Sequence, residues 1–199
     1  MGEKEILKGK NNPIYGLVLS GGKSTRMGSE KALIQFRNHS FVEHTFQLLH
    51  TFCKKVFISC RQDQVSFFQG LPIIEDMYKD IGPLAGLLAA GKKYPDAGWA
   101  VLGVDMPHIT PPVFAQLIQN RNVHNMGTVF YHPSNDAFEP LCAIYEHEFL
   151  PVLENEHLQG HHSLQKILHN YPIHKVIWPK HIHIHSINTI QDLNDLLAT

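Results

Sequence analysis

Residues 16–31 read GLVLSGGKSTRMGSEK and combine an apolar strand, a glycine turn and three cations. The first four residues are apolar, and Ser20 and a glycine pair then end the run without side-chain bulk. Lys23, Arg26 and Lys31 follow within nine residues. Backbone N–H groups of a glycine turn point at an anion, and the cations neutralise it. The pattern therefore predicts a buried strand that leads into a phosphate-binding loop.

This loop fits neither of two familiar phosphate-binding motifs. The P-loop pattern, G-x-x-x-x-G-K-[ST], needs a glycine at position 17, which is Leu17 here. The dinucleotide fingerprint, G-x-G-x-x-G, fails because Gly21 and Gly22 are adjacent and the next glycine is Gly28. These residues can therefore be interpreted in two ways, as a phosphate-binding loop of a third kind or as a flexible basic turn.

The composition is that of a globular protein. A length of 199 residues, of which 43% are hydrophobic, favours one large domain. We expect a polar tail at residues 1–13 and a single domain at 14–199. The net charge of −1 argues against broad nucleic-acid binding. Three cysteines without a C-x-x-C pair, no long apolar run and no signal-peptide core predict a cytoplasmic protein that is not attached to a membrane.

Strand and helix signals alternate along the chain, which predicts an α/β fold. Later strands are expected at residues 55–60, 73–74, 99–104, 128–131, 138–145, 173–178 and 182–187. Helices are expected after a capping box of Ser40 and Glu43, after Gly82 and Pro83, from Pro111, and at residues 146–154 and 162–169, with a last one after Thr189.

Three polar features follow apolar strands: the glycine loop after Leu19, Asp76 after Ile74, and Asp105 after Val104. The carboxyl ends of parallel strands meet at one edge of a sheet, where ligands bind. Cations and amides beside carboxylates suit a nucleoside triphosphate with Mg²⁺, because the metal bridges carboxylate and phosphate oxygens. The alternative is that each aspartate only caps a turn.

Histidine is abundant, with 15 copies, and the densest run is HIHIH at 181–185. Alternation places His181, His183 and His185 on one strand face. We interpret them as a polar edge-strand face rather than a metal site, because nothing nearby completes a ligand set. His161 and His162 receive the same interpretation.

The motif LSGGKSTRMGSEKAL resembles the signature of the small nucleotidyltransferases, and most closely that of the molybdenum cofactor guanylyltransferases. The segments IIEDMYKDIGPLAGLLAA, GVDMPHI, EPLCAIY and HSINTIQDL also resemble segments of that family, in the same order. The resemblance covers residues 15–196. It implies a three-layer sandwich with a mostly parallel, Rossmann-like sheet, as in the nucleotide-diphospho-sugar transferases.

The resemblance also implies a reaction and a set of site residues. GMP would pass from GTP to the molybdopterin cofactor, with release of pyrophosphate, and transient contacts with other cofactor-biosynthesis proteins are expected. Arg26, Lys31 and Asp105 would be catalytic, and Asp105 would also bind Mg²⁺. The residues implied to contact GTP are Leu19, Ser20, Gly21, Gly22, Lys31, Asp76 and Asp105.

The chain departs from the family pattern in places. Ser20 stands where alanine is common, Glu30 precedes Lys31 where aspartate is common, and residues 58–60 lack an asparagine that some members use. A cytidylyltransferase or sugar-phosphate nucleotidyltransferase is an alternative, although Gly22 favours the guanylyl branch. A second alternative is a regulator that binds GTP without turning it over.

Overall fold

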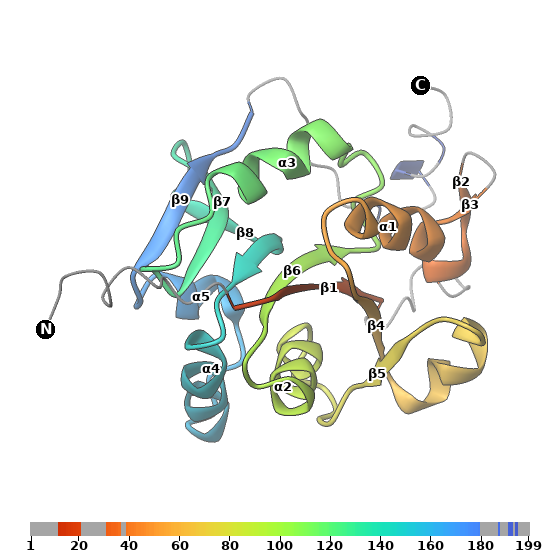
Figure 1. Ribbon diagram of the computed structural model, residues 1–199, viewed down its shortest axis with the longest axis horizontal. Helices are drawn as coiled ribbons and strands as arrows, with labels where there is room; N and C mark the ends of the chain where they lie inside the picture. Colours follow the sequence, from red (N-terminus) through yellow and green to blue (C-terminus); the bar gives the residue numbers. More distant parts are fainter. Residues whose placement is uncertain are drawn as a thin grey trace, which may run out of the picture.

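A seven-stranded sheet runs through the computed structural model, which describes residues 12–20, 31–36, 39–179, 187, 191, 192 and 194 (Figure 1). The strands lie across the sheet in the order β5 (Ile73–Glu75), β4 (Val56–Cys60), β1 (Ile14–Leu19), β6 (Gly98–Gly103), β8 (Ala137–Tyr145), β7 (Gly127–His132) and β9 (Ile173–Ile177). Within this sheet β8 is antiparallel to both of its neighbours, and the other pairings are parallel. The predicted, mostly parallel sheet is thereby confirmed.

Helices cover both faces of the sheet, as the predicted three-layer sandwich requires. One face packs against α1 (Phe41–His50) and α3 (Pro111–Gln119) (Figure 1). The opposite face packs against α2 (Leu84–Lys93), α4 (Phe149–Leu158) and α5 (Leu164–Leu168). The 3-10 helix η1 (Lys31–Leu33), the hairpin of β2 (Gln35–Phe36) and β3 (His39–Ser40), and the 3-10 helix η2 (Gln62–Phe68) complete the described elements.

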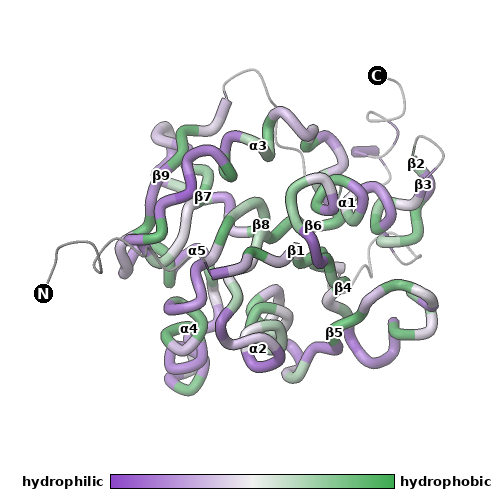
Figure 2. Tube along the Cα trace, viewed as in Figure 1, coloured by the Kyte–Doolittle hydropathy of each residue, from purple (hydrophilic) through white to green (hydrophobic). Residues whose placement is uncertain are grey.

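Alternation along the central strands supplies two hydrophobic cores. Val18 packs on the α1 and α3 side and Leu17 on the α2 side, and neither side chain is exposed. Successive residues of a strand point to opposite faces, so a strand between two helix layers must be apolar throughout. Figure 2 shows the hydrophobic colour concentrated on these inner strands. The apolar run before the loop therefore anchors the loop to the centre of the sheet.

The start of α1 is formed by the capping box that the sequence predicts. The Ser40 N–H donates to Glu43 Oε2 at 2.7 Å, and the Glu43 N–H donates to Ser40 Oγ at 3.4 Å, so the capping box forms. The hydrogen bonds that the Glu43 carboxylate accepts from the Ser40 N–H and hydroxyl lower the pKa of Glu43. The helix expected from residue 146 begins instead at Phe149, because the Glu146 N–H still donates to the Met126 carbonyl at 3.0 Å and continues the β7–β8 pairing. The Glu146 carboxylate accepts hydrogen bonds from the Arg121 guanidinium at 2.8 and 2.7 Å.

Several expectations concern segments at the two ends of the chain. Of the proposed tail, only residues 12 and 13 are described, and the Pro13 carbonyl accepts a hydrogen bond from the Gly98 N–H at 2.9 Å. His181, His183 and His185 lie outside the described residues. The three cysteines are buried and free. In the described part of the chain, no helix has the length and apolarity needed to cross a membrane.

Candidate active site

The carboxyl edge of the parallel strands gathers the predicted site residues that the structure describes. Leu19 ends β1 and is buried, and Ser20 follows it with only 4% of its surface exposed. Asp76 follows β5, and Asp105 follows β6. Because β1 pairs with β4 on one side and β6 on the other, the loop after β1 begins at the centre of this edge.

Three predicted site residues, Gly21, Gly22 and Arg26, lie outside the described residues, as does Lys23. Lys31 is the first described residue beyond that segment and begins η1. The structure therefore places the two ends of the glycine loop. Its phosphate-binding role remains a prediction.

Lys31 and Asp105 face one another across the edge of the sheet. The Lys31 Nζ lies 3.9 Å from Asp105 Oδ2, and the two side chains are only 16% and 19% exposed. The Asp105 carbonyl also accepts a hydrogen bond from the Ile187 N–H at 2.9 Å, which ties the strand end to a late segment of the chain. Two residues predicted from separate motifs thus form one charged pair.

Glu139 is a second carboxylate at this edge, and sequence reasoning missed it. It lies near the start of β8, the antiparallel neighbour of β6, and is close enough to Asp105 for the two charges to interact. Burial, with a smaller effect from the Asp105 charge, raises the pKa of Glu139 to about 7. The available signal was the EPLCAIY segment, in which an acidic residue opens an otherwise apolar run.

A second polar group links the ends of β1, β4 and β5. The Ser59 hydroxyl, at the end of β4, donates to Asp76 Oδ1 at 2.5 Å. The Ser20 hydroxyl donates to the Ser59 carbonyl at 2.7 Å. Burial raises the pKa of Asp76, and the hydrogen bond from Ser59 partly opposes that rise. Ser59 was also missed, although it occupies the same strand-end position as the residues that were found.

The residues present fit a divalent cation that is shared with a substrate. Asp105 and Glu139 supply hard oxygen donors, and their mutual repulsion would be relieved by a cation between them. Among the described residues, no cluster of three His, Cys, Asp or Glu side chains could hold a metal alone. Mg²⁺ is usually held by one or two carboxylates together with substrate phosphates, which this arrangement matches.

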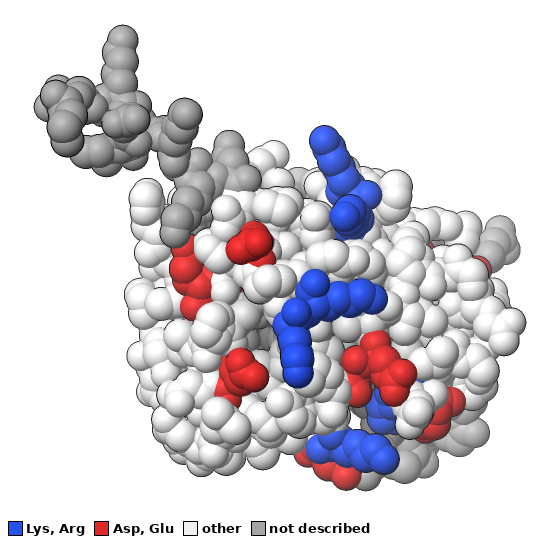
Figure 3. All heavy atoms as spheres, turned by 60° about the horizontal axis from the view of Figure 1, so that its bottom comes forward, with Lys and Arg blue, Asp and Glu red and all other residues white. Residues whose placement is uncertain are grey.

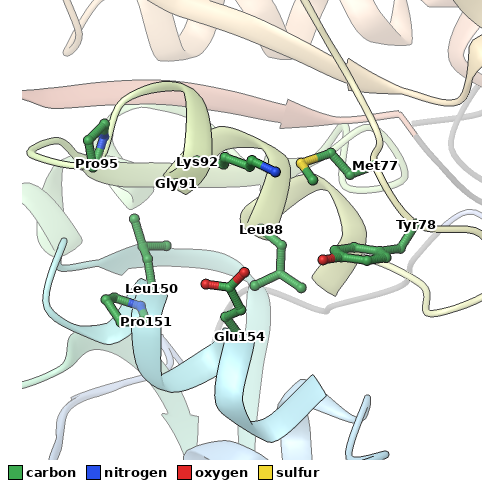
Figure 4. Close-up of a pocket in the computed structure, with 9 residues that line it drawn as sticks. All are labelled: Met77, Tyr78, Leu88, Gly91, Lys92, Pro95, Leu150, Pro151 and Glu154. Atoms are coloured by element: carbon green, nitrogen blue, oxygen red, sulfur yellow. The ribbon is translucent and has the colours of Figure 1, made fainter. Parts of the chain in front are cut away.

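Two cavities lie apart from the described site residues. One, of about 340 Å³, lies between α2 and α4, where Lys92 and Glu154 extend into it (Figure 4). The other, of about 430 Å³, lies beside the β2–β3 hairpin and η2. No described site residue lines either cavity.

On the face that Figure 3 shows, acidic and basic side chains are intermingled.

Comparison with known proteins places this geometry among nucleotidyltransferases. The family described as MobA-like NTP transferase domain matches residues 16–176. The "Molybdenum cofactor biosynthesis bifunctional protein" of Synechocystis is 33% identical over 78% of this chain, which spans only 46% of that relative. The "Probable molybdenum cofactor guanylyltransferase" of Flavobacterium johnsoniae is 30% identical, over 90% of this chain and 94% of that protein.

Solved structures share the fold. Molybdopterin-guanine dinucleotide biosynthesis protein A from Archaeoglobus fulgidus has a TM-score of 0.74 at 23% identity, over 92% of this chain and 97% of that one. Rv0371c from Mycobacterium tuberculosis, in a complex with manganese, has a TM-score of 0.65 at 16% identity, over 94% and 99%. At these identities the likeness concerns the fold alone.

Proposed function

Because the chain belongs to the family of MobA-like NTP transferase domains, as its sequence motifs indicated, we propose that it transfers GMP from GTP to molybdopterin. The products are molybdopterin guanine dinucleotide and pyrophosphate. Relatives named molybdenum cofactor guanylyltransferase support this assignment. One of them, from Flavobacterium johnsoniae, matches this chain over nearly its whole length.

The pairing of Lys31 with Asp105 carries the proposal. It brings a cation from the end of the glycine loop to within 3.9 Å of a carboxylate at the end of β6. Phosphoryl and nucleotidyl transfer need positioning and charge neutralisation more than covalent help from the protein. This edge of the sheet supplies both.

Each site residue has a role in this scheme. Lys31 and Arg26 neutralise the triphosphate, and the backbone of Gly21 and Gly22 cradles it. Asp76 holds the nucleoside. Leu19 and Ser20 contact the guanine nucleotide at the end of β1.

The chemistry at the α-phosphate follows from that placement. The terminal phosphate of the pterin attacks the α-phosphate of GTP, and the bond to pyrophosphate breaks. Asp105, with Glu139 beside it, would hold a Mg²⁺ ion. When bound, that ion neutralises phosphate charge. Lys31 keeps the reacting phosphate within reach of these carboxylates, so that the two substrates meet in a fixed orientation.

The proposal extends to the surroundings of the enzyme. Its substrates are small molecules, and neither a nucleic acid nor a membrane takes part. We place it in the cytoplasm, where it transiently contacts the proteins that supply the pterin.

A thermal-shift series tests the nucleotide preference. GTP, ATP, CTP and UTP are each added with and without Mg²⁺. Ligand binding stabilises the folded state by about 2.7 kcal/mol at a hundredfold excess over Kd. GTP with Mg²⁺ is expected to give the largest shift. A larger shift with CTP would indicate a cytidylyltransferase, and GTP binding without pyrophosphate release in the presence of acceptor would indicate a regulator.

A further inference from the structure

Ser59 is a buried hydroxyl that no sequence motif singled out. Only 1% of its surface is exposed, and it lies in β4 between the ends of β1 and β5. Its hydroxyl donates to Asp76 Oδ1 at 2.5 Å, and its carbonyl accepts from both the N–H and the hydroxyl of Ser20, at 3.1 and 2.7 Å. The end of β1 is therefore connected to Asp76 through one residue.

The helix above Ser59 confines the direction of that hydroxyl. A Cβ atom added at Gly86 of α2 would lie 2.1 Å from Ser59 Oγ and 2.9 Å from Leu19 Cδ2. Gly86 is the last residue of the GPLAG segment, so the absence of a side chain there lets the helix backbone cover the serine. With α2 on one side, the hydroxyl is directed at the carboxylate.

Asp76 is held at both its backbone and its side chain. Its N–H donates to the Cys60 carbonyl at 2.9 Å, and Ser59 occupies one carboxylate oxygen. Among the described side chains, Ser59 is the one that hydrogen-bonds this carboxylate. Such a bond fixes the plane of the carboxylate and leaves Oδ2 for a ligand.

Resting on the proposed function, we infer that Ser59 is a positioning residue that orients the Asp76 carboxylate toward the nucleoside of the bound triphosphate. Asp76 Oδ2 then accepts an N–H or O–H hydrogen bond from the nucleoside. Ser59 itself touches no substrate. Its contribution is to nucleoside recognition and not to phosphate binding.

The test separates those two parts of the ligand. Affinities for GTP and for inorganic triphosphate are measured by calorimetry for wild type and Ser59→Ala. Hydrogen bonds to charged groups contribute strongly to binding, so loss of this one is expected to lower the affinity for GTP about tenfold. Inorganic triphosphate should bind unchanged. Thr45→Val is the matched control, since it removes another buried hydroxyl, which donates to the Phe41 carbonyl in α1.

A double-mutant cycle shows whether the effect passes through Asp76. In an Asp76→Ala background, Ser59→Ala is expected to change GTP affinity no further. Ser59→Cys, which keeps only a weak donor, serves as a second variant if Ser59→Ala does not fold. This variant too should lower the affinity for GTP and leave the affinity for inorganic triphosphate unchanged.

Three results would overturn the inference: unchanged GTP affinity in the Ser59 variants, an equal loss for GTP and triphosphate, or full additivity with Asp76→Ala. If wild type binds GTP no better than inorganic triphosphate, the proposed function fails as well. If wild type binds GTP more tightly than inorganic triphosphate, and the Ser59 variants show the same difference in affinity, only the role of Ser59 is wrong.

Discussion

The Lys31 ammonium lies 3.9 Å from the Asp105 carboxylate, although the two residues belong to separate sequence motifs. A cation at the end of the glycine loop and an anion at the end of β6 thus share one partly buried location. Opposite charges at this distance attract by about 4 kcal/mol at an effective dielectric constant of 20. A triphosphate that enters the site must therefore compete with Asp105 for Lys31.

Replacing Lys31 by alanine should impair turnover far more than folding. The loss of one charge that stabilises the reacting phosphates is expected to lower kcat/KM for GTP about 100-fold. Pyrophosphate release measures this loss. Lys54→Ala is the control, because Lys54 is an exposed cation before β4, at the opposite edge of the sheet. Activity in Lys31→Ala equal to that of the control would contradict the phosphate role.

Asp105→Asn should keep the fold, because the side-chain shape is unchanged, and should lose most Mg²⁺-dependent turnover. It is expected to bind metal-free GTP more tightly than wild type, since two like charges at 4 Å cost about 4 kcal/mol at an effective dielectric constant of 20. Pyrophosphate release against Mg²⁺ concentration is the measurement. Asp96→Asn, at an exposed residue before β6, is the control. Superimposable wild-type and Asp105→Asn curves would exclude the metal role.

The Glu139 carboxyl predicts a pH dependence of stability. Its pKa is about 7 in the folded protein against 4.5 ordinarily, so the folded state keeps a proton that the unfolded state releases. The free energy of unfolding should therefore fall as pH rises through this window, by up to about 3 kcal/mol. Glu139→Gln carries no titrating group at this position.

Urea unfolding of wild type and Glu139→Gln, at pH 5 and pH 8 without divalent metal, checks this prediction. The variant is expected to be more stable than wild type at pH 8, with a smaller difference at pH 5. The same difference at both pH values would show that Glu139 does not hold a proton in the folded state.

Gly86→Ala should disturb both stability and nucleotide binding. The new methyl group would lie 2.1 Å from Ser59 Oγ and displace the hydroxyl from Asp76. Overpacking of this kind costs about 1–3 kcal/mol, which exceeds the gain of about 1 kcal/mol in helix propensity. GTP affinity should fall with it, as thermal unfolding and calorimetry can measure together.

Gly91→Ala is the matched control for that substitution. Its methyl group would meet Leu150 of α4 at 2.9 Å, which is a milder clash in the same helix but away from Ser59. It should lower stability without weakening GTP. The combination of Gly86→Ala with Ser59→Ala should recover part of the lost stability, because the clashing hydroxyl is gone while the contacts with Leu19 Cδ2 at 2.9 Å and with the Cβ of residue 59 at 3.0 Å remain. An equal loss of GTP affinity in both glycine variants would show that packing of α2, and not Ser59, controls binding.

Much of the architecture could be predicted because it depends on local signals. Ser40 and Glu43 lie in one helical turn, so their capping box could be read from sequence. Looking for polar residues just beyond apolar strands, which we call the strand-end rule, found Asp76 and Asp105, because each comes within two residues of a buried apolar residue of its strand. The same rule applied to β4 would have found Ser59.

Glu139 could not be predicted in this way, because its importance depends on long-range pairing. It reaches the site only because β8 enters the sheet antiparallel, between β6 and β7. The N-terminal end of an antiparallel strand lies beside the C-terminal ends of its neighbours. A site residue in such a strand therefore comes at its beginning and not after its end. Neither this strand order nor this direction can be deduced from the residues of β8 alone.

The most direct measurement supplies the purified chain with molybdopterin, Mg²⁺ and one nucleoside triphosphate at a time. Mass spectrometry identifies the pterin product, and pyrophosphate is quantified in parallel. With GTP, the account predicts molybdopterin guanine dinucleotide and one equivalent of pyrophosphate, both dependent on Lys31 and Asp105. Formation of the cytosine dinucleotide in preference, or no dinucleotide with any triphosphate, would contradict it.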